Sequence, residues 1–314
     1  MRCLCCQKDF INLDKGGWCQ TCIKKFFGTS KMPIIDLNEE KIKSLVENNV
    51  KNHLTIPGVQ KKLSLTLSSF ENTKKLTLVN YMSGYILKPQ VEEFECLPEA
   101  EFLTMTLAQI VGIKTVPNGL IKLENNTFAY ITKRIDRVKH GKEVKSIAME
   151  DFCQLSERAT KDKYHSSYEQ CAKIIDKYSE NKLLDKVELF YRILFFYITG
   201  NSDMHLKNFS LIKKQNYYCL SNAYDLVPVK TIMPEDEEDL ALTLNGKKRH
   251  IRRGDFYKFG LSIGLSKITI ENMIKKIISF KDKLIEATND SNLTIDQKEN
   301  LIELIDARIN ELAV

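Results

Sequence analysis

Apolar and polar residues alternate with the two-residue period of strands over much of residues 54–137. The segment LSLTLS at 63–68 alternates leucine with small hydroxyl residues, which is typical of a strand buried on one face. Further strands are predicted at 76–80, 84–90, 119–124 and 128–135. Residues 98–113, with a proline in the first turn, and residues 37–53 have helical spacing. We therefore expect a small antiparallel sheet with one long helix in it.

Beyond Arg137 the strand signals fade and helical spacing takes over. Apolar residues recur three and four positions apart over 183–198, which predicts a buried helix of a second lobe. A β-hairpin within 209–225 is predicted to carry Asp225 at its far end. Residues 267–314 have the pattern of amphipathic helices. The second half of the chain is therefore expected to be mainly helical.

The length of 314 residues exceeds the usual size of one domain and favours two lobes. A hydrophobic fraction of 43% and a charged fraction of 28% are ordinary for globular proteins. The formal net charge of +6 suits an anionic ligand, but basic and acidic residues are mostly interleaved, so we do not expect direct nucleic-acid binding. A basic cluster at 247–253 fits a solvated loop as well as a phosphate-binding or partner-binding surface.

The apolar run LFYRILFFYI at 189–198 is short and contains Arg192, so no membrane span is predicted. The polar, cysteine-rich start of the chain differs from a signal peptide. We therefore expect a cytoplasmic protein whose nine cysteines are reduced. Action in its own cell and export into a host cell are both compatible with these residues.

Five of the nine cysteines lie in the first 22 residues. Cys3 and Cys6 form one C-x-x-C pair, and Cys19 and Cys22 form another. Two such pairs, twelve residues apart, are typical of one tetrahedral structural zinc ion. Cys5 lies between the first two ligands and is a possible substitute for either. The alternative is a set of free thiols in a loose tail.

The segment GNSDMHLKNFS at 200–210 places Asp203 and Asn208 five positions apart, directly after the predicted buried helix. Kinases carry a catalytic aspartate and a metal-binding asparagine at this spacing. We expect Asp203 to orient an acceptor hydroxyl, and Asn208 and Asp225 to bind Mg²⁺. Lys207 would neutralise charge that develops on the transferred group.

Two lysines beside the predicted sheet, Lys62 and Lys88, are suited to the phosphates of a nucleotide, and Lys88 is expected to hold the α and β phosphates. Each candidate also has a simpler interpretation, since aspartate and asparagine often cap turns and lysines often end strands in solvent. The kinase interpretation is favoured because Lys88, Asp203, Asn208 and Asp225 occur in the chain in the order that it requires.

Six segments resemble, in order, the signature blocks of the HipA family of bacterial serine/threonine kinases, the toxins of toxin–antitoxin modules. They are GVQKKLSL, GYILKPQ, ITKRIDR, MEDFCQL, GNSDMHLKNFS and LSNAYDLVP. The resemblance covers about residues 53–256 and is to the short, HipT-like or C-terminal-only form. It implies an α+β, two-lobed protein-kinase-like fold, with an antiparallel-sheet N-lobe at 31–137 and a helical C-lobe at 138–314. On this resemblance, the cysteine module at 1–30 is expected to take the place of the family's extra N-terminal subdomain.

The resemblance places the family's ATP-binding lysine on Lys88 and its catalytic aspartate on Asp203. Its magnesium-binding residues fall on Asn208 and Asp225. His205, in the same loop, is assigned to packing beside the nucleotide rather than to proton transfer.

The family's phosphate loop, which carries an autophosphorylated serine, falls on residues 54–62. That loop includes Gly58, and Thr55 occupies the hydroxyl position. Lys133 and Ile135 replace a glutamate and a phenylalanine near the nucleotide, so the contacts to adenine are expected to differ.

The function implied is an ATP- and Mg²⁺-dependent serine/threonine protein kinase that inhibits itself by autophosphorylation near Thr55. Its implied substrate is a translation component such as an aminoacyl-tRNA synthetase. Its implied partners are a HipB-like DNA-binding antitoxin and a small HipS-like protein that supplies the N-subdomain. A small-molecule kinase and a pseudokinase that regulates an antitoxin are the alternatives, and retention of all four site residues argues against the pseudokinase.

Overall fold

The computed structural model describes residues 1–35, 62–70, 73–78, 84–140 and 143–314. The chain forms two compact units. The first contains residues 1–102 and 116–146, and the second contains residues 103–115 and 147–314. The helix expected at 37–53 lies outside the described residues. The boundaries expected at residues 30 and 137 stay predictions.

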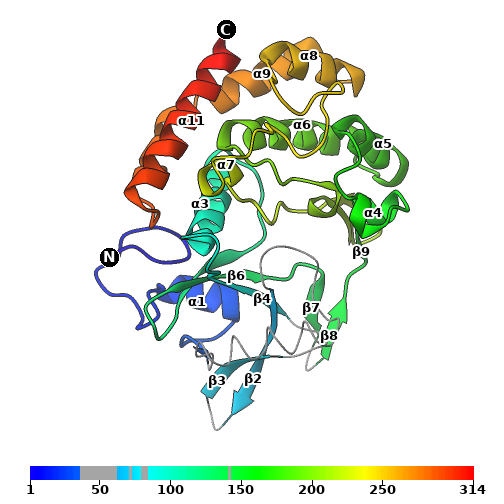
Figure 1. Cartoon of the computed structure of the whole chain (residues 1–314). Helices are drawn as coiled ribbons and strands as arrows, with labels where there is room; N and C mark the ends of the chain where they lie inside the picture. Colours follow the sequence, from blue (N-terminus) through cyan, green and yellow to red (C-terminus); the bar gives the residue numbers. More distant parts are fainter. Residues whose placement is uncertain (36–61, 71–72, 79–83, 141–142) are drawn as a thin grey trace. The chain divides into compact units, whose positions relative to one another are not determined.

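A six-stranded sheet with the order β1-β3-β2-β4-β6-β5 forms the first unit (Figure 1). The pairs are antiparallel except for the parallel edge pair of β1 and β3. All five strands predicted for this region are present, and β1 is an additional one. The strands are β1 (Ile34–Ile35), β2 (Leu63–Phe70), β3 (Thr73–Leu78), β4 (Tyr85–Pro89), β5 (Asn118–Lys122) and β6 (Phe128–Lys133).

The cysteine segment and helix α1 (Gln20–Phe27) pack against this sheet and share its hydrophobic core (Figure 1). The Trp18 ring is fully buried, contacts Phe26 and Phe27, and donates from Nε1 to the Leu120 carbonyl at 2.7 Å. Leu120 in turn donates its backbone N–H to the Leu4 carbonyl at 2.8 Å. Burying a large apolar side chain stabilises a fold by about 1.5–3 kcal/mol. The N-terminal segment is therefore part of the unit's core and not a loose tail.

Strands continue beyond Arg137, contrary to the prediction. A hairpin of β7 (Arg137–His140) and β8 (Glu143–Ser146) follows the main sheet, and β9 (Met149–Asp151) pairs with a strand of the second unit. These strands are short and rich in charged residues, so they lack the apolar face on which a period-two signal depends. β9 in addition pairs with a strand far along the chain, which a local pattern does not contain.

Helix α3 (Leu97–Ile110) begins in the first unit and ends in the second, close to its predicted bounds. The second unit is mainly helical, as predicted, and contains a small sheet with the order β11-β10-β9. Besides β9, this sheet contains β10 (Ser210–Lys214) and β11 (Tyr217–Leu220), which form the predicted hairpin. The helices that follow in the second unit are α4 (Phe152–Leu155), η1 (Thr160–Asp162), α5 (Tyr168–Tyr178), α6 (Lys182–Thr199), η2 (Leu206–Asn208), α7 (Val229–Ile232), α8 (Arg253–Ser262), α9 (Lys267–Ile278), α10 (Lys281–Asn289) and α11 (Ile295–Ala313).

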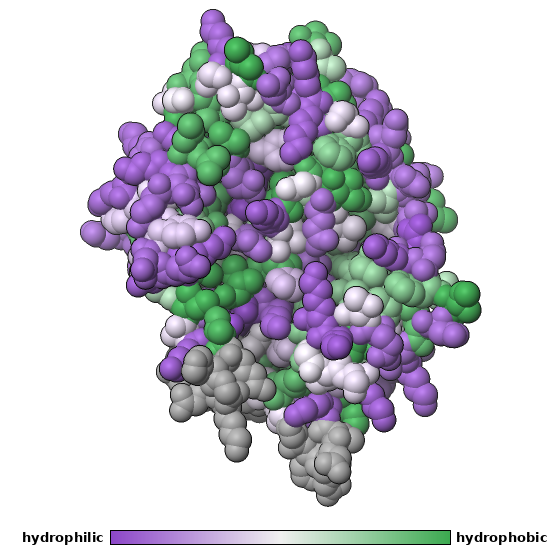
Figure 2. Space-filling model, turned by 180° about the vertical axis from the view of Figure 1, so that it is seen from behind, coloured by the Kyte–Doolittle hydropathy of each residue, from purple (hydrophilic) through white to green (hydrophobic). Residues whose placement is uncertain are grey.

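Helix α6 is the central rod of the second unit, and residues 189–199 of it are all buried. It packs against α5, α9 and α11. In the part of the chain that the structure describes, no helix has the length and apolarity that crossing a membrane requires. On the face drawn in Figure 2, hydrophilic residues are spread among the hydrophobic ones.

Candidate active site and metal centre

The loop that carries the kinase-like residues starts at a glycine that no other residue could replace without strain. Gly200 ends α6 in the left-handed conformation, with φ 63°. A Cβ atom there would lie 2.5 Å from Cδ2 of Leu304 and 3.0 Å from Cβ of Lys230. The buried helix and these neighbours together fix the base of the loop.

Asp203 and Asn208 are held by hydrogen bonds within one tight turn. His205 donates its N–H to the Asp203 carbonyl at 2.8 Å, and Asn208 donates its N–H to the His205 carbonyl at 2.9 Å. The side-chain amide of Asn208 donates from Nδ2 to the Asp203 carbonyl at 2.9 Å. Because Nδ2 is engaged there, the amide oxygen of Asn208 is left to accept from, or to ligate, another group. Asp203 itself is exposed, although the residues around it are buried.

Asp225 is attached to this turn through its neighbour Tyr224. The Tyr224 hydroxyl donates to the Lys207 carbonyl at 3.0 Å and lies 2.6 Å from Oγ of Ser210. Asp225 has φ 61°, a left-handed conformation that costs a residue with a Cβ atom about 1–2 kcal/mol. Strained conformations of this kind cluster at functional sites. Asp203, Asn208 and Asp225 thus all lie in the second unit, and Tyr224 joins the backbone beside Asp225 to the turn of Asp203 and Asn208.

Lys207 and His205 have structural contacts of their own. The Lys207 ammonium lies 3.1 Å from Oδ2 of Asp151, which also caps the N-terminus of α4. His205 is 5% exposed and packs edge-on against the Tyr164 ring, with ring centroids 4.9 Å apart. The roles assigned to both residues stay predictions.

Tyr164 is a site residue that sequence reasoning missed. Its hydroxyl donates a hydrogen bond to Oδ1 of Asp203. Burial raises the pKa of Tyr164 far above its usual value, and the negative charge of Asp203 raises it further. The segment KDKYHSS around it is polar and has no periodic pattern, so no local signal links it to Asp203.

In the first unit, Lys88 on β4 forms a buried ion pair with Glu101 on α3. Nζ of Lys88 lies 2.5 Å from Oε1 of Glu101, and the two residues are 3% and 0% exposed. Nζ also lies 5.3 Å from the centroid of the Tyr130 ring. Active protein kinases require an ion pair between a strand lysine and a helix glutamate. No local pattern in the sequence pairs Glu101 with Lys88.

The remaining nucleotide candidates lie in the first unit or outside the described residues. Lys62 is half-buried and directly precedes β2. Lys133 donates from Nζ to the Phe26 carbonyl at 3.1 Å, and burial lowers its pKa. Ile135 is half-buried. Thr55 and Gly58 lie outside the described residues.

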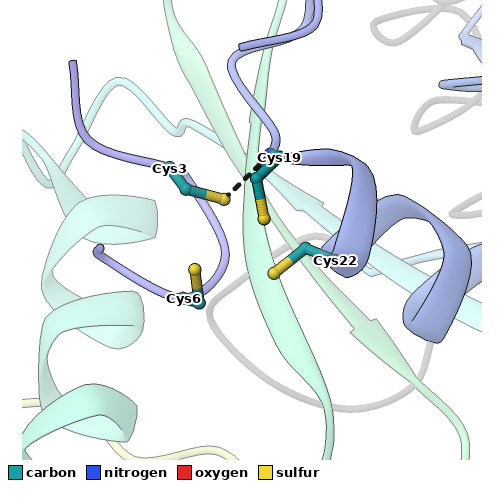
Figure 3. A group of neighbouring side chains, drawn as sticks. All are labelled: Cys3, Cys6, Cys19 and Cys22. Carbon is teal, nitrogen blue, oxygen red and sulfur yellow. Dashed lines mark hydrogen bonds between the residues drawn. The ribbon is translucent and has the colours of Figure 1, made fainter. Parts of the chain in front are cut away.

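The four cysteines predicted to bind zinc converge on one point (Figure 3). Their Sγ atoms all lie within 4.8 Å of one another. Zn–S bonds of about 2.3 Å in a tetrahedron separate the sulfur atoms by about 3.8 Å, so a small contraction would complete a zinc site. Cys19 is the N-cap of α1 and donates its N–H to Sγ of Cys3 at 3.2 Å. The donor set and its geometry fit structural zinc.

Cys5 is not part of this quartet. Its thiol donates to the Asn118 carbonyl at 3.5 Å. Burial raises the pKa of Cys5 to about 12, which disfavours the thiolate that a metal ligand needs.

Comparisons with known proteins point to one family. The family model of the HipA-like C-terminal domain matches residues 54–284. A "Putative kinase" of Haemophilus influenzae is 32% identical over 256 residues, which cover 74% of each chain. The "Serine/threonine-protein kinase toxin HipA" of Shewanella oneidensis is 28% identical over 214 residues, which cover 62% of this chain. This chain spans 47% of that toxin and 49% of "Putative kinase Y4dM" of Sinorhizobium fredii.

Two solved structures resemble the fold. HipA in a Shewanella oneidensis complex with HipB and operator DNA has a TM-score of 0.67 and 21% identity, covering 82% of this chain and 64% of that one. The Helicobacter pylori proinflammatory kinase CtkA has a TM-score of 0.51 and 15% identity, covering 80% and 95%. At these identities the likeness shows the fold alone. It confirms the predicted α+β, kinase-like fold with an antiparallel-sheet part and a helical part.

Proposed function

This chain belongs to the HipA-like C-terminal domain family, and on that premise we propose that it is an ATP-dependent serine/threonine protein kinase. The names of its relatives support a kinase-like function. The finer proposal is that the γ-phosphoryl group of ATP passes to a protein hydroxyl. In this reaction Asp203 orients the hydroxyl, and Asn208 and Asp225 hold Mg²⁺.

The observation that carries the proposal is the hydrogen-bonded turn of Asp203 and Asn208. In it, Asp203 is exposed, and Nδ2 of Asn208 is engaged by the Asp203 carbonyl, so the amide oxygen of Asn208 is left to ligate another group. Magnesium prefers oxygen ligands, and bound magnesium would neutralise charge on the phosphates. The chain's own residues orient the acceptor at Asp203 and bind phosphate oxygens at Lys88. The Lys88–Glu101 pair supports the proposal independently, because Glu101 holds the ammonium in place.

The test is phosphoryl transfer from γ-labelled ATP with Mg²⁺, to the protein and to the small-molecule fractions of a bacterial extract. We expect label in protein Ser or Thr. Asp203→Asn and Asp225→Asn should each lower transfer by about a hundredfold or more, as loss of a group that acts in the transition state does. Asp282→Asn, on the exposed start of α10, is the matched control and should keep wild-type transfer.

Wild-type transfer by Asp203→Asn would contradict the proposed site. Label that appears only in small molecules would favour the small-molecule kinase. Folding of each variant is checked by its melting temperature, which should remain unchanged. Asn tolerates the left-handed conformation of Asp225, so this substitution adds no backbone strain.

We also propose the finer features that the family implies. A Thr55 phosphate would add nearly two negative charges to the loop expected to hold ATP and would weaken nucleotide binding. A DNA-binding antitoxin is the proposed partner, because the structurally similar HipA is seen in a complex with HipB and operator DNA. A translation component as substrate, a small protein that supplies the N-subdomain and a cytoplasmic location are proposals of the same kind.

Zinc at Cys3, Cys6, Cys19 and Cys22 is proposed to be structural. Four thiolate ligands leave no open position for a substrate or water. The quartet lies at the N-terminus of α1, which packs into the core of the sheet. The ion would therefore stabilise the unit that carries Lys88.

A further inference from the structure

The contact between Tyr164 and Asp203 has the chemistry of a substrate contact. A catalytic aspartate in a kinase accepts a hydrogen bond from the hydroxyl that will be phosphorylated. Here the hydroxyl that donates to Oδ1 of Asp203 belongs to Tyr164 of the same chain. Both residues lie in the second unit.

Tyr164 is held in this position from several sides. Its ring packs edge-on against His205, at 4.9 Å between centroids. The ammonium groups of Lys163 and Lys248 lie 4.9 Å and 6.0 Å from the ring centroid. These contacts favour one ring orientation.

The backbone around Tyr164 is also hydrogen-bonded to the loop at 200–210 that carries Asp203. Leu206 donates its N–H to the Lys163 carbonyl at 3.2 Å. On the other side, Arg158 donates from Nη1 to the His165 carbonyl at 2.5 Å. The segment that presents the hydroxyl is therefore anchored on both sides of Tyr164.

We propose that the Tyr164 hydroxyl occupies the place of the acceptor hydroxyl at Asp203, so that Tyr164 is a gate that the acceptor must displace. This inference rests on the proposed kinase function. A hydrogen bond to a charged group is stronger than one between neutral groups, so an acceptor that displaces Tyr164 loses part of its binding energy. Tyr164 acts through Asp203 and is a positioning residue rather than a catalytic one.

Tyr164→Phe removes the hydroxyl and keeps the ring that packs on His205. The probe is magnesium-dependent hydrolysis of ATP to ADP and phosphate, with water as the acceptor. We expect Tyr164→Phe to raise its rate about tenfold, because water no longer competes with the phenol for Asp203. A residue with a merely structural role would lower the rate on mutation. Tyr217→Phe, on an exposed tyrosine at the start of β11, should leave the rate unchanged.

A double variant shows whether the effect passes through Asp203. Tyr164→Phe combined with Asp203→Asn should hydrolyse ATP no faster than Asp203→Asn alone. A double variant as fast as Tyr164→Phe would overturn the gate, and so would an unchanged or lower rate in a folded Tyr164→Phe protein.

These outcomes are distinct from failure of the proposed function. If neither wild type nor Tyr164→Phe hydrolyses or transfers phosphate from ATP, the kinase function fails and the gate fails with it. Turnover by wild type that Tyr164→Phe does not raise would overturn the gate alone. Turnover that appears only in Tyr164→Phe would support the gate most directly.

Discussion

Lys88 and Glu101 compensate each other's charge in a place where neither charge would be tolerated alone. Both are almost fully buried, and their charged atoms are 2.5 Å apart. Removing one partner of a buried pair leaves an uncompensated charge, whereas replacing both with apolar residues is often neutral. This difference separates the pair's contribution to stability from its proposed contribution to nucleotide binding.

Lys88→Met is expected to lower the free energy of unfolding by about 3–5 kcal/mol, because it removes the ammonium group that pairs with the buried Glu101 carboxylate. Adding Glu101→Met should restore most of that stability, as measured by urea unfolding. Nucleotide binding should be lost in the single and in the double variant. A double variant that binds ATP as tightly as wild type would exclude Lys88 from the phosphate site.

The buried carboxyl group of Glu99 is expected to make the stability of the protein depend on pH. Burial raises its pKa to about 6 from the usual 4.5, with a smaller contribution from Glu95, and Oε2 has no hydrogen-bond partner among the described residues. The folded protein therefore binds this proton more tightly than the unfolded one. The proton's contribution to stability is complete below about pH 4.5 and is lost as the pH rises through about 6.

Glu99→Gln should remove this dependence. The variant's stability relative to wild type should increase by on the order of 1–2 kcal/mol between pH 4.5 and pH 6.5. Urea unfolding of both proteins at several pH values measures the difference. A difference that stays constant with pH would show that Glu99 has the same pKa in both states.

Helix α1 is joined to the sheet by Trp18 and to the cysteine quartet by Cys19 and Cys22. The cysteine quartet and the aromatic cluster of Trp18, Phe26 and Phe27 therefore form one structural element. Gly119 on β5 makes the contact possible, because a Cβ atom there would lie 2.4 Å from Cζ2 of Trp18. Loss of the metal is expected to disturb the packing of Trp18 on β5.

Zinc removal should be visible in the fluorescence of Trp18, the chain's single tryptophan. Purified protein is expected to contain one zinc ion. Cys22→Ser should lose the ion, shift the emission of Trp18 to longer wavelength and lower the melting temperature, because the buried ring becomes hydrated. Cys5→Ser is the matched control and should keep the zinc and the emission spectrum. Loss of zinc from Cys5→Ser instead would make Cys5 a ligand.

The residues proposed to bind nucleotide and metal are divided between the two units of the chain. Lys88 and Glu101 belong to the first unit, and Asp203, Asn208 and Asp225 belong to the second. A ligand that binds only the folded chain stabilises it in proportion to the logarithm of its concentration. Mg²⁺–ATP is therefore expected to raise the melting temperature of the protein.

At a hundred times its dissociation constant, Mg²⁺–ATP should stabilise the wild type by about 2.7 kcal/mol. Lys88→Met/Glu101→Met and Asp225→Asn should each abolish this increase, measured as the rise in melting temperature on adding nucleotide. Asp282→Asn should keep it. A full rise in either site variant would remove that residue from the nucleotide site.

The fold was largely predictable where one face of an element is apolar. The five strands between 63 and 133, helix α6 and the hairpin before Asp225 were found from periodicity, because burial of one face leaves a repeating pattern. The strands after Arg137 were missed, because short strands rich in charged residues have no repeating apolar pattern. β1 was missed because two residues are too short to show a repeating pattern.

For the candidate site, the sequence by itself grouped residues that are close in the chain or have a diagnostic spacing. Asp203 and Asn208 share one turn, and the four cysteines of the two C-x-x-C pairs lie together. Tertiary structure alone revealed the partners of these groups. Glu101 meets Lys88 across 13 residues, and Tyr164 meets Asp203 across 39. Such contacts depend on how helices and strands pack, and packing brings together side chains whose separation in the chain carries no periodic signal.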